Sequence, residues 1–445
     1  MPVYYAASGS LLITWGSIYL VSRGDKNVYG IPFGPGVFFV VFHFLYTVLP
    51  GVSAYFIYGS QLDEFLLISL LSSIFFAVSY IVSLKILSPK MFILPRCTRS
   101  ERISIWFQVF LFFALFVLVL TLKTGSPISY FTMSYDDRIY MEDRWLACSL
   151  ILLEISILRA SVVLLRSRKF WRSSGLVTAF LVFSLFIGKR TPAVTVALPF
   201  GFLLLYYRVL SKRVLAIVFV FGLLFFQSYN VFRSAFTNSS SFLEVARRGA
   251  YLEMLRFTSG DLAAPVRNFI IIKDIDRDYF VSFAGESYIS SFLFLLPAEF
   301  ERGKGLGEKL TELAFSDWYA VGGGAAFGAV NEAYVNFGIW APIAYFFWGM
   351  LISWYTKLIS LRSFSVNYYI FMFSLLLTWT LAVHRNTFAD SLKTTEVIFV
   401  LYGVVWMIWQ VFCVVRRACL SLDGNLMRKS PFYRRRFPSK GEIFA

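Results

Sequence analysis

A glutamate near the end of a long polar stretch could act as a catalytic base. Glu332 follows Gly322-Gly323-Gly324 and precedes an apolar run that begins near residue 338. Glycines let the backbone approach a ligand closely and adopt positive φ. A carboxylate at the edge of a low-dielectric region has a raised pKa, which suits general-base catalysis. A structural ion pair or a helix cap is the alternative role for Glu332.

Basic residues in the neighbouring polar segments could hold an anionic group. A planar guanidinium binds phosphate through charge-assisted hydrogen bonds, and several guanidinium groups could hold a pyrophosphate without a metal. Pairing with acidic residues or with lipid phosphate is the alternative. The candidates are Lys189, Arg190, Arg247, Arg248, Arg267, Arg277 and Arg385.

The two histidines and some of the tyrosines are secondary candidates. His384, beside Arg385, could accept a proton, but we rank it below Glu332 because such histidines are more often simply hydrogen-bonded. His43 lies within an apolar run, so we expect it to be buried and neutral. Tyr288 and Tyr334 could stack on sugars. With only two histidines and no metal-type cysteine spacing, neither a zinc site nor any other metal or cofactor is predicted.

One apolar run carries two charges. Glu154 and Arg159 are five residues apart, which is a poor helical spacing for a mutual pair. Charges at membrane depth cost about 2.5–3.5 kcal/mol each, so we expect partners on other helices and favour a structural role.

The composition defines the elements that must position these residues. The chain of 445 residues is 58% hydrophobic and 15% charged, whereas soluble domains average about 45–50% apolar and about 25% charged. This predicts an all-α polytopic membrane protein with about eleven transmembrane helices. The expected spans are 3–22, 35–58, 65–87, 104–123, 144–165, 174–188, 191–208, 214–234, 338–357, 366–383 and 395–415.

Charge orients the expected bundle. Alternate connections are rich in lysine and arginine, and such connections stay in the cytoplasm. The N-terminus is therefore expected outside and the C-terminus inside. The net charge of +16 comes from the cytoplasmic side, so we do not predict nucleic-acid binding. The basic tail, with Arg434-Arg435-Arg436, is expected to lie against anionic lipid headgroups.

Four regions follow from this pattern. Residues 1–234 form an N-terminal bundle of about eight helices, and 235–337 form a large, mostly helical loop outside the membrane. Residues 338–415 supply about three more helices, and 416–445 form the tail. Within the loop, Ile270-Ile271-Ile272 is expected to be a short strand or a buried turn. The segment from Ile289 to Leu296 is apolar but too short to span a membrane, so we expect it at the interface.

Motifs of several enzyme classes are missing from the sequence. There is no GxxxxGK[ST] phosphate loop, no HExxH and no GxSxG. These absences argue against an ATP-driven pump and against a zinc protease.

Three short motifs resemble those of the O-antigen polymerases (Wzy type), the oligosaccharide repeat unit polymerases. They are Gly188-Lys189-Arg190-Thr191-Pro192, Gly285-Glu286-Ser287-Tyr288 before Leu295-Leu296-Pro297, and the stretch from Gly322 to Gly338 with Glu332, Tyr334 and Asn336-Phe337-Gly338. The overall plan is also similar, with about a dozen helices and one large periplasmic loop late in the chain.

The resemblance implies a metal-independent, GT-C-type glycosyltransferase of the bacterial inner membrane. It would move a growing glycan from undecaprenyl pyrophosphate to a new lipid-linked repeat at the periplasmic face. Glu332 would deprotonate the acceptor hydroxyl. Arg190 and arginines of the large loop would hold the pyrophosphate, while Arg385 matches the family pattern only loosely. Expected partners are the lipid-linked oligosaccharide, membrane lipid and a protein that sets chain length.

Two alternatives remain at this stage. An O-antigen ligase shares the plan but is expected to use a histidine in its large loop, and no histidine occurs between Ala235 and Phe337. A flippase or transporter is expected to show internal repeats and broken helices that meet at the membrane midplane. No such repeat is evident in the sequence.

Overall fold

The structure of the protein is a computed structural model. The described residues are 2–89, 99–126, 144–186, 191–211, 263–295, 304–316, 325–360 and 366–393, with a few isolated positions outside these ranges. Helices and turns make up this described part, and it contains no strand. The predicted all-α fold class is therefore confirmed at that level.

The first helices follow the first apolar runs closely. A five-residue π-helix directly follows His43, and a turn at Gly59, with φ of +59°, reverses the chain before the next long helix. The elements are α1 (Pro2–Tyr29), α2 (Pro35–His43), the π-helix η1 (Phe44–Val48), α3 (Leu49–Tyr58), η2 (Gly59–Leu62) and α4 (Asp63–Leu87).

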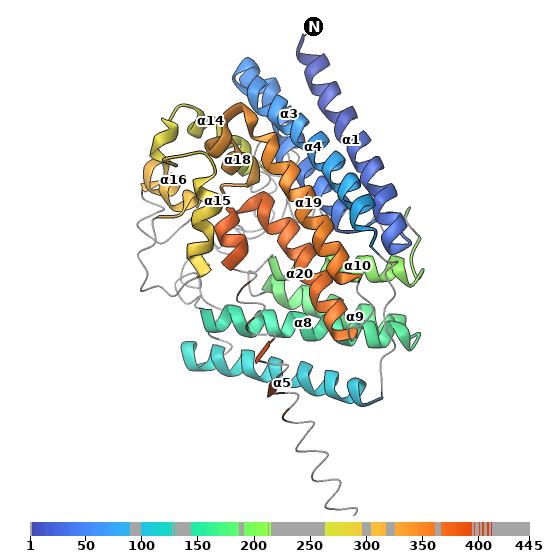
Figure 1. The fold of residues 1–445 in the computed structure, drawn as a ribbon. Helices are drawn as coiled ribbons and strands as arrows, with labels where there is room; N and C mark the ends of the chain where they lie inside the picture. The colour runs from blue at the N-terminus through green and yellow to red at the C-terminus, as the bar shows by residue number, and fades with distance from the viewer. Residues whose placement is uncertain are drawn as a thin grey trace, which may run out of the picture. The chain divides into compact units, whose positions relative to one another are not determined.

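The long helix α4 packs along α19 (Pro342–Ile359), as Figure 1 shows. Gly349 allows the close approach, since a Cβ there would lie 2.8 Å from the carbonyl oxygen of Phe76. Farther along, the Ser353 hydroxyl donates to the carbonyl of Tyr80 at 3.0 Å, and Lys357 Nζ donates to the carbonyl of Leu87 at 2.6 Å. Residue numbers rise together along both helices, so α4 and α19 are parallel.

A second group of helices covers residues 99–206. It consists of α5 (Arg99–Thr124), α8 (Arg144–Arg166), α9 (Phe170–Phe186) and α10 (Thr191–Tyr206), with α5 and α8 side by side in Figure 1. The buried charges of α8 find partners on other helices, as predicted. Thr195 on α10 donates to Glu154 at 2.6 Å, and Arg159 donates to Gln108 on α5 at 2.5 Å.

The polar region before α19 folds into short helices. They are α14 (Ala264–Lys273), η4 (Arg277–Tyr279), α15 (Glu286–Ser290), η5 (Ser291–Leu295), α16 (Leu306–Ala314), α18 (Ala329–Phe337) and η6 (Gly338–Trp340). Three of them, α14, α16 and α18, share a small apolar core that includes Ile272, Leu310 and Val335. The expectation of a strand or turn at residues 270–272 was wrong, because Pro265 starts a helix that continues through the isoleucines.

The last long helix of the described part is α20 (Val366–Arg385), which packs against α2 and α10. Two helical stretches in the described part, Pro35–Leu87 and Ile105–Thr124, are long and apolar enough to cross a membrane. The predicted number of spans stays a prediction. Residues from Glu396 onward form a separate unit, of which only isolated positions are described.

Candidate functional site

The helix α18 holds Glu332 in the interior of the protein. It begins after Gly328, whose φ is +80°. A Cβ at that position would also lie 3.0 Å from the carbonyl oxygen of His384, so only glycine fits without strain. Glu332 lies in the first turn of α18 and its side chain is only 2% exposed.

Two other segments donate hydrogen bonds to the Glu332 carboxylate. The Ser287 hydroxyl on α15 donates to Oε1 at 2.9 Å, and the backbone N–H of Phe388 donates to Oε2 at 2.6 Å. Asn336, one turn after Glu332, donates to the Ser287 Oγ at 2.6 Å and accepts from the Ser287 N–H at 3.2 Å. Glu332 therefore joins α15, α18 and the segment after α20.

The segment after α20 presents a helix start to the carboxylate. Residues 388–393 are helical, and Thr387 and Asp390 cap this helix reciprocally. The Thr387 Oγ1 accepts from the Asp390 N–H at 3.2 Å, while Asp390 accepts from the Thr387 hydroxyl at 2.7 Å. Phe388 is the first helical residue, so its N–H is free to bind Glu332. The partial positive charge of a helix start favours a carboxylate there.

The electrostatic balance makes Glu332 a carboxylate that titrates near neutral pH. The pKa of Glu332 is raised to about 7, chiefly by burial and with a smaller contribution from the charge of Asp390. The hydrogen bonds from Phe388 and Ser287 favour the charged form and lower the pKa, but they do not offset burial. A general base works best when its pKa lies close to the operating pH.

A cavity of about 220 Å³ lies beside Glu332. Its polar lining comes from α15, α16, α18 and the segments next to them: Glu286, Ser287, Ser290, Ser291, Lys304, Lys309, Glu332 and Thr387. Lys304 is half exposed and pairs with Glu312 at 2.7 Å. Lys309 donates to the carbonyl of Phe280 at 2.9 Å. The cavity thus combines one buried carboxylate with two cationic side chains.

The predicted anion-binding residues fall into three groups. Lys189, Arg190, Arg247 and Arg248 lie outside the described residues. Arg267 is exposed on α14, and Arg385 is half-buried at the end of α20; neither lines the cavity. Arg277 donates to the carbonyls of Val335 and Asn336, so it caps the end of α18 and does not reach the cavity.

The remaining predicted residues lie around Glu332 in different roles. Asn336 is buried and orients Ser287, as described above. The Tyr334 hydroxyl donates to Glu64 at 3.4 Å, so this side chain is directed toward the start of α4. His384 is buried at the end of α20, and its ring lies 4.5 Å from that of Phe39. Of these three residues, only Asn336 supports the Glu332 hydrogen bonds directly.

Sequence reasoning missed several members of the site. Ser287 is 45 residues from Glu332 in the sequence, and Phe388 is 56 residues from it. No local sequence pattern indicates hydrogen bonds between residues so far apart. The Thr387-x-x-Asp390 capping box can be recognised in the sequence, and it predicts that a helix starts shortly after His384. No motif distinguishes Lys304 and Lys309 from other surface lysines.

The arrangement can remove a proton from a hydroxyl group that enters the cavity and can hold an anionic group beside it. A Glu332 carboxylate with two fixed hydrogen bonds is held in one orientation, which favours reaction with a correctly placed substrate. No family model, no curated protein and no solved structure matches this chain.

Proposed function

We propose that this protein is a bacterial glycan polymerase of the O-antigen polymerase type, with Glu332 as its general base. The observation that carries the proposal is the buried Glu332 carboxylate at a cavity, fixed by Ser287 and Phe388 and titrating near neutral pH. The motif that contains Ser287 and the motif that contains Glu332 are both among those that resemble this family. Their direct hydrogen bond supports reading them as parts of one site.

The proposed reaction transfers a growing glycan from undecaprenyl pyrophosphate to a new lipid-linked repeat. Glu332 takes the proton from the acceptor hydroxyl as that oxygen forms a bond to the anomeric carbon of the donor. The bond between the anomeric carbon and the phosphate oxygen breaks, and undecaprenyl pyrophosphate leaves with the electron pair. No nucleotide is consumed, in keeping with the absence of nucleotide-binding motifs.

The leaving pyrophosphate requires cationic groups. Lys304 and Lys309 line the cavity and are the described cations closest to this role. Arg190, Arg247 and Arg248 would add guanidinium groups from segments outside the described residues. Ile289, Phe292 and Leu293 expose large apolar side chains next to the cavity lining, as expected for a site that receives a lipid carrier at a membrane surface.

The proposed membrane arrangement has eleven spans, an outer large loop, a GT-C-type plan and a cytoplasmic C-terminus. In that arrangement α1, α4 and α19 are odd-numbered spans and must run in the same direction. The parallel register of α4 and α19 meets this requirement. Glu64 at the start of α4 and Tyr334 before α19 are hydrogen-bonded, so both helix starts face the same side. This agreement supports the topology that the charge pattern predicts.

A deletion strain tests the proposal. Without this protein, lipid A should carry single repeats in place of a long-chain ladder on a gel. Glu332→Gln and Arg190→Ala should each fail to restore the ladder at normal protein level, whereas Asp274→Asn, which removes an exposed carboxylate outside the cavity lining, should restore it. Loss of all repeats from lipid A would favour a ligase, and repeats trapped on the cytoplasmic face would favour a flippase.

A further inference from the structure

The cavity beside Glu332 has the size of a single sugar ring. Its volume of about 220 Å³ is smaller than that of pockets for drug-sized molecules, which measure roughly 300–1,000 Å³. A whole oligosaccharide repeat therefore does not fit inside, whereas its terminal ring does. The lining also includes apolar side chains that could contact the carbon-bound hydrogens of such a ring, namely Phe280, Val281, Leu293 and Leu306.

Three hydroxyl groups of the cavity lining already donate their protons to the protein. The Ser287 hydroxyl donates to Glu332, and the Thr387 hydroxyl donates to Asp390. The Ser291 hydroxyl donates to the backbone carbonyl of Ser287. A hydroxyl group has only one proton to donate, so these three side chains hold the cavity wall in place and have no proton left for a ligand.

The two lysines of the lining come from the α16 side of the cavity. Lys304 precedes α16 and pairs with Glu312 on that helix at 2.7 Å. Lys309, within α16, donates to the carbonyl of Phe280 at 2.9 Å. An ammonium group has three protons, so both lysines can also bind a phosphate oxygen. The donor pyrophosphate of the proposed reaction therefore belongs on the α16 side, which leaves the α15 side for the acceptor.

On the α15 side, Glu286 offers a second carboxylate to the same cavity as Glu332. The backbone N–H of Ser282 donates to the Glu286 Oε2 and fixes this side chain. A carboxylate can accept about four hydrogen bonds, so Glu286 keeps capacity for a ligand. Ser290, four residues later on the same face of the helix, also lines the cavity. Its hydroxyl makes only a long hydrogen bond, of 3.3 Å, to the carbonyl of Ser287.

Two carboxylates in one small cavity favour a ligand that donates hydrogen bonds. A carboxylate or phosphate group would be repelled by them, whereas a sugar hydroxyl can donate to either. Ser287 directly follows Glu286 and donates to Glu332, so the two carboxylates lie on either side of this serine. A sugar ring carries hydroxyl groups on neighbouring carbon atoms, and two of them can face the two carboxylates at once.

We propose that this cavity is the subsite for the terminal sugar of the acceptor, and that Glu286 determines which sugar is accepted by binding the hydroxyl group next to the reacting one. The inference rests on the proposed function. Glu332 takes the proton of the reacting hydroxyl, while Glu286 accepts a hydrogen bond from its neighbour and holds the ring in one orientation. The terminal sugar is therefore uncharged and has two neighbouring free hydroxyl groups.

Acceptors that lack single hydroxyl groups test this subsite with the unaltered protein. The donor is the lipid-linked repeat purified from cells that lack this protein. The acceptors are synthetic copies of the repeat without lipid pyrophosphate, each missing one hydroxyl of the terminal sugar. Removal of a hydroxyl next to the reacting one should raise the acceptor KM at least about tenfold and change kcat much less. An unchanged KM for every such analogue would overturn the proposal.

Variants at Glu286 assign the effect to this side chain. Glu286→Ala should raise KM for the complete acceptor by a similar factor and should no longer distinguish it from the deoxy analogue, because both partners of one hydrogen bond are then absent. Glu286→Gln keeps an oxygen for the Ser282 N–H and should show a smaller effect in the same direction. Asp274→Asn, at an exposed site outside the lining, is the control. Glu286 variants that reject the deoxy analogue as strongly as wild type would overturn the assignment.

A binding measurement separates this inference from the proposed function. The complete acceptor without pyrophosphate should raise the Tm of the wild-type protein and of Glu332→Gln, and this rise should be lost in Glu286→Ala. A wild-type protein that shows this pattern but makes no polymer would overturn the proposed function and leave the sugar-binding site. A protein that makes polymer, with equal acceptor KM and equal Tm rise in wild type and Glu286→Ala, would overturn the subsite alone.

Discussion

At the scale of single residues, burial destabilises the charged form of Glu332 and also raises its pKa toward neutral pH. A carboxylate removed from water is less stable in its charged form, and the two hydrogen bonds it accepts recover only part of that loss. The same loss moves its pKa into the range where a base can accept a proton and release it again. A surface glutamate would be charged at neutral pH but would be a much weaker base.

The pH dependence of the proposed reaction follows from this pKa. Only the charged carboxylate can take a proton, and its pKa is raised to about 7. The rate should therefore fall about tenfold for each pH unit below 7 and level off above it. Initial rates of polymer formation across pH 5–9 measure this. A rate that stays flat down to pH 5 would show that a group with an ordinary carboxylate pKa, or no base, limits the reaction.

The pH dependence of stability provides an independent prediction. The pKa of Glu332 is about 7 in the folded protein against 4.5 for the free side chain, so the folded state binds this proton more tightly. The protonated side chain is stabilising below pH 4.5, and this contribution, about 3 kcal/mol, is lost as pH rises through 7. Glutamine mimics the protonated form. Glu332→Gln should therefore raise Tm relative to wild type at pH 8 and have little effect at pH 4.5, measured by thermal unfolding in detergent.

At the scale of elements, α18 connects the long helices to the short helices. Gly328 sets its start against the carbonyl of His384, Arg277 caps its end, and Tyr334 links it to α4. Asn336 and Glu332, four residues apart on one face, both contact Ser287. The packing of α18 against α14 and α20 therefore fixes the position of the Glu332 carboxylate.

The packing of α4 against α19 predicts a contrast between two glycines. An alanine at Gly349 would press on the side chain of Ser79 and on the carbonyl of Phe76, 2.8 Å away, so the helices would have to separate. Such overpacking costs about 1–3 kcal/mol. Gly175 in α9 has nothing within 4 Å of the corresponding Cβ position, so Gly175→Ala should be neutral or stabilise by up to about 1 kcal/mol. Equal Tm values for the two variants would contradict this account of the interface.

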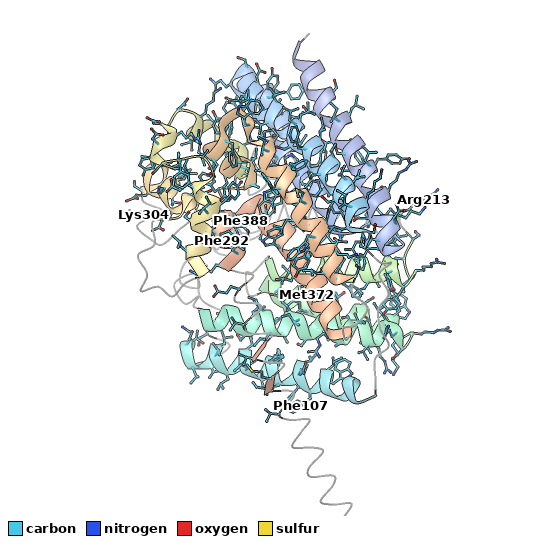
Figure 2. The ribbon with its side chains drawn as sticks, in the orientation of Figure 1. Phe107, Arg213, Phe292, Lys304, Met372 and Phe388 are labelled. Carbon is cyan, nitrogen blue, oxygen red and sulfur yellow. The ribbon has the colours of Figure 1, made fainter. Side chains whose placement is uncertain are left out.

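Figure 2 shows how the aromatic side chains of different elements meet beside the site. Phe292 of η5 and Phe388 of the segment after α20 lie with ring centroids 6.2 Å apart. The Tyr288 ring contacts the same Phe388 ring. These contacts hold α15 and η5 against the helix start that binds Glu332, so the cavity wall and the carboxylate are positioned together.

At the scale of the whole molecule, helix positions could be predicted where a long apolar run dominates the local sequence. The apolar runs at 65–87, 104–123, 144–165 and 366–383 all coincide with helices, because apolar length is a local property of the sequence. The prediction of a strand or turn at Ile270-Ile271-Ile272 was wrong. β-Branched residues favour strands only weakly, and the packing of Ile272 into a core overrides that preference.

The candidate site was predictable only in part for a related reason. The sequence predicted Glu332 at the edge of a low-dielectric region with a raised pKa, and the structure places the side chain in the interior with a pKa raised to about 7. Its partners Ser287 and Phe388 could not be predicted, because they come from other segments and depend on the tertiary fold. His43 is buried as predicted, but nothing in the sequence indicated that it would face Tyr345 and His384.

The most direct test of the proposed function is polymer formation by the purified protein from lipid-linked repeats. We predict that the wild-type protein makes a ladder of products without nucleotide, and that Glu332→Gln lowers kcat by about 10²–10⁴-fold. Asp274→Asn, which removes an exposed carboxylate outside the cavity lining, should keep near wild-type activity. A Glu332→Gln protein that is folded and polymerises repeats at the wild-type rate would contradict the assignment of Glu332 as the base.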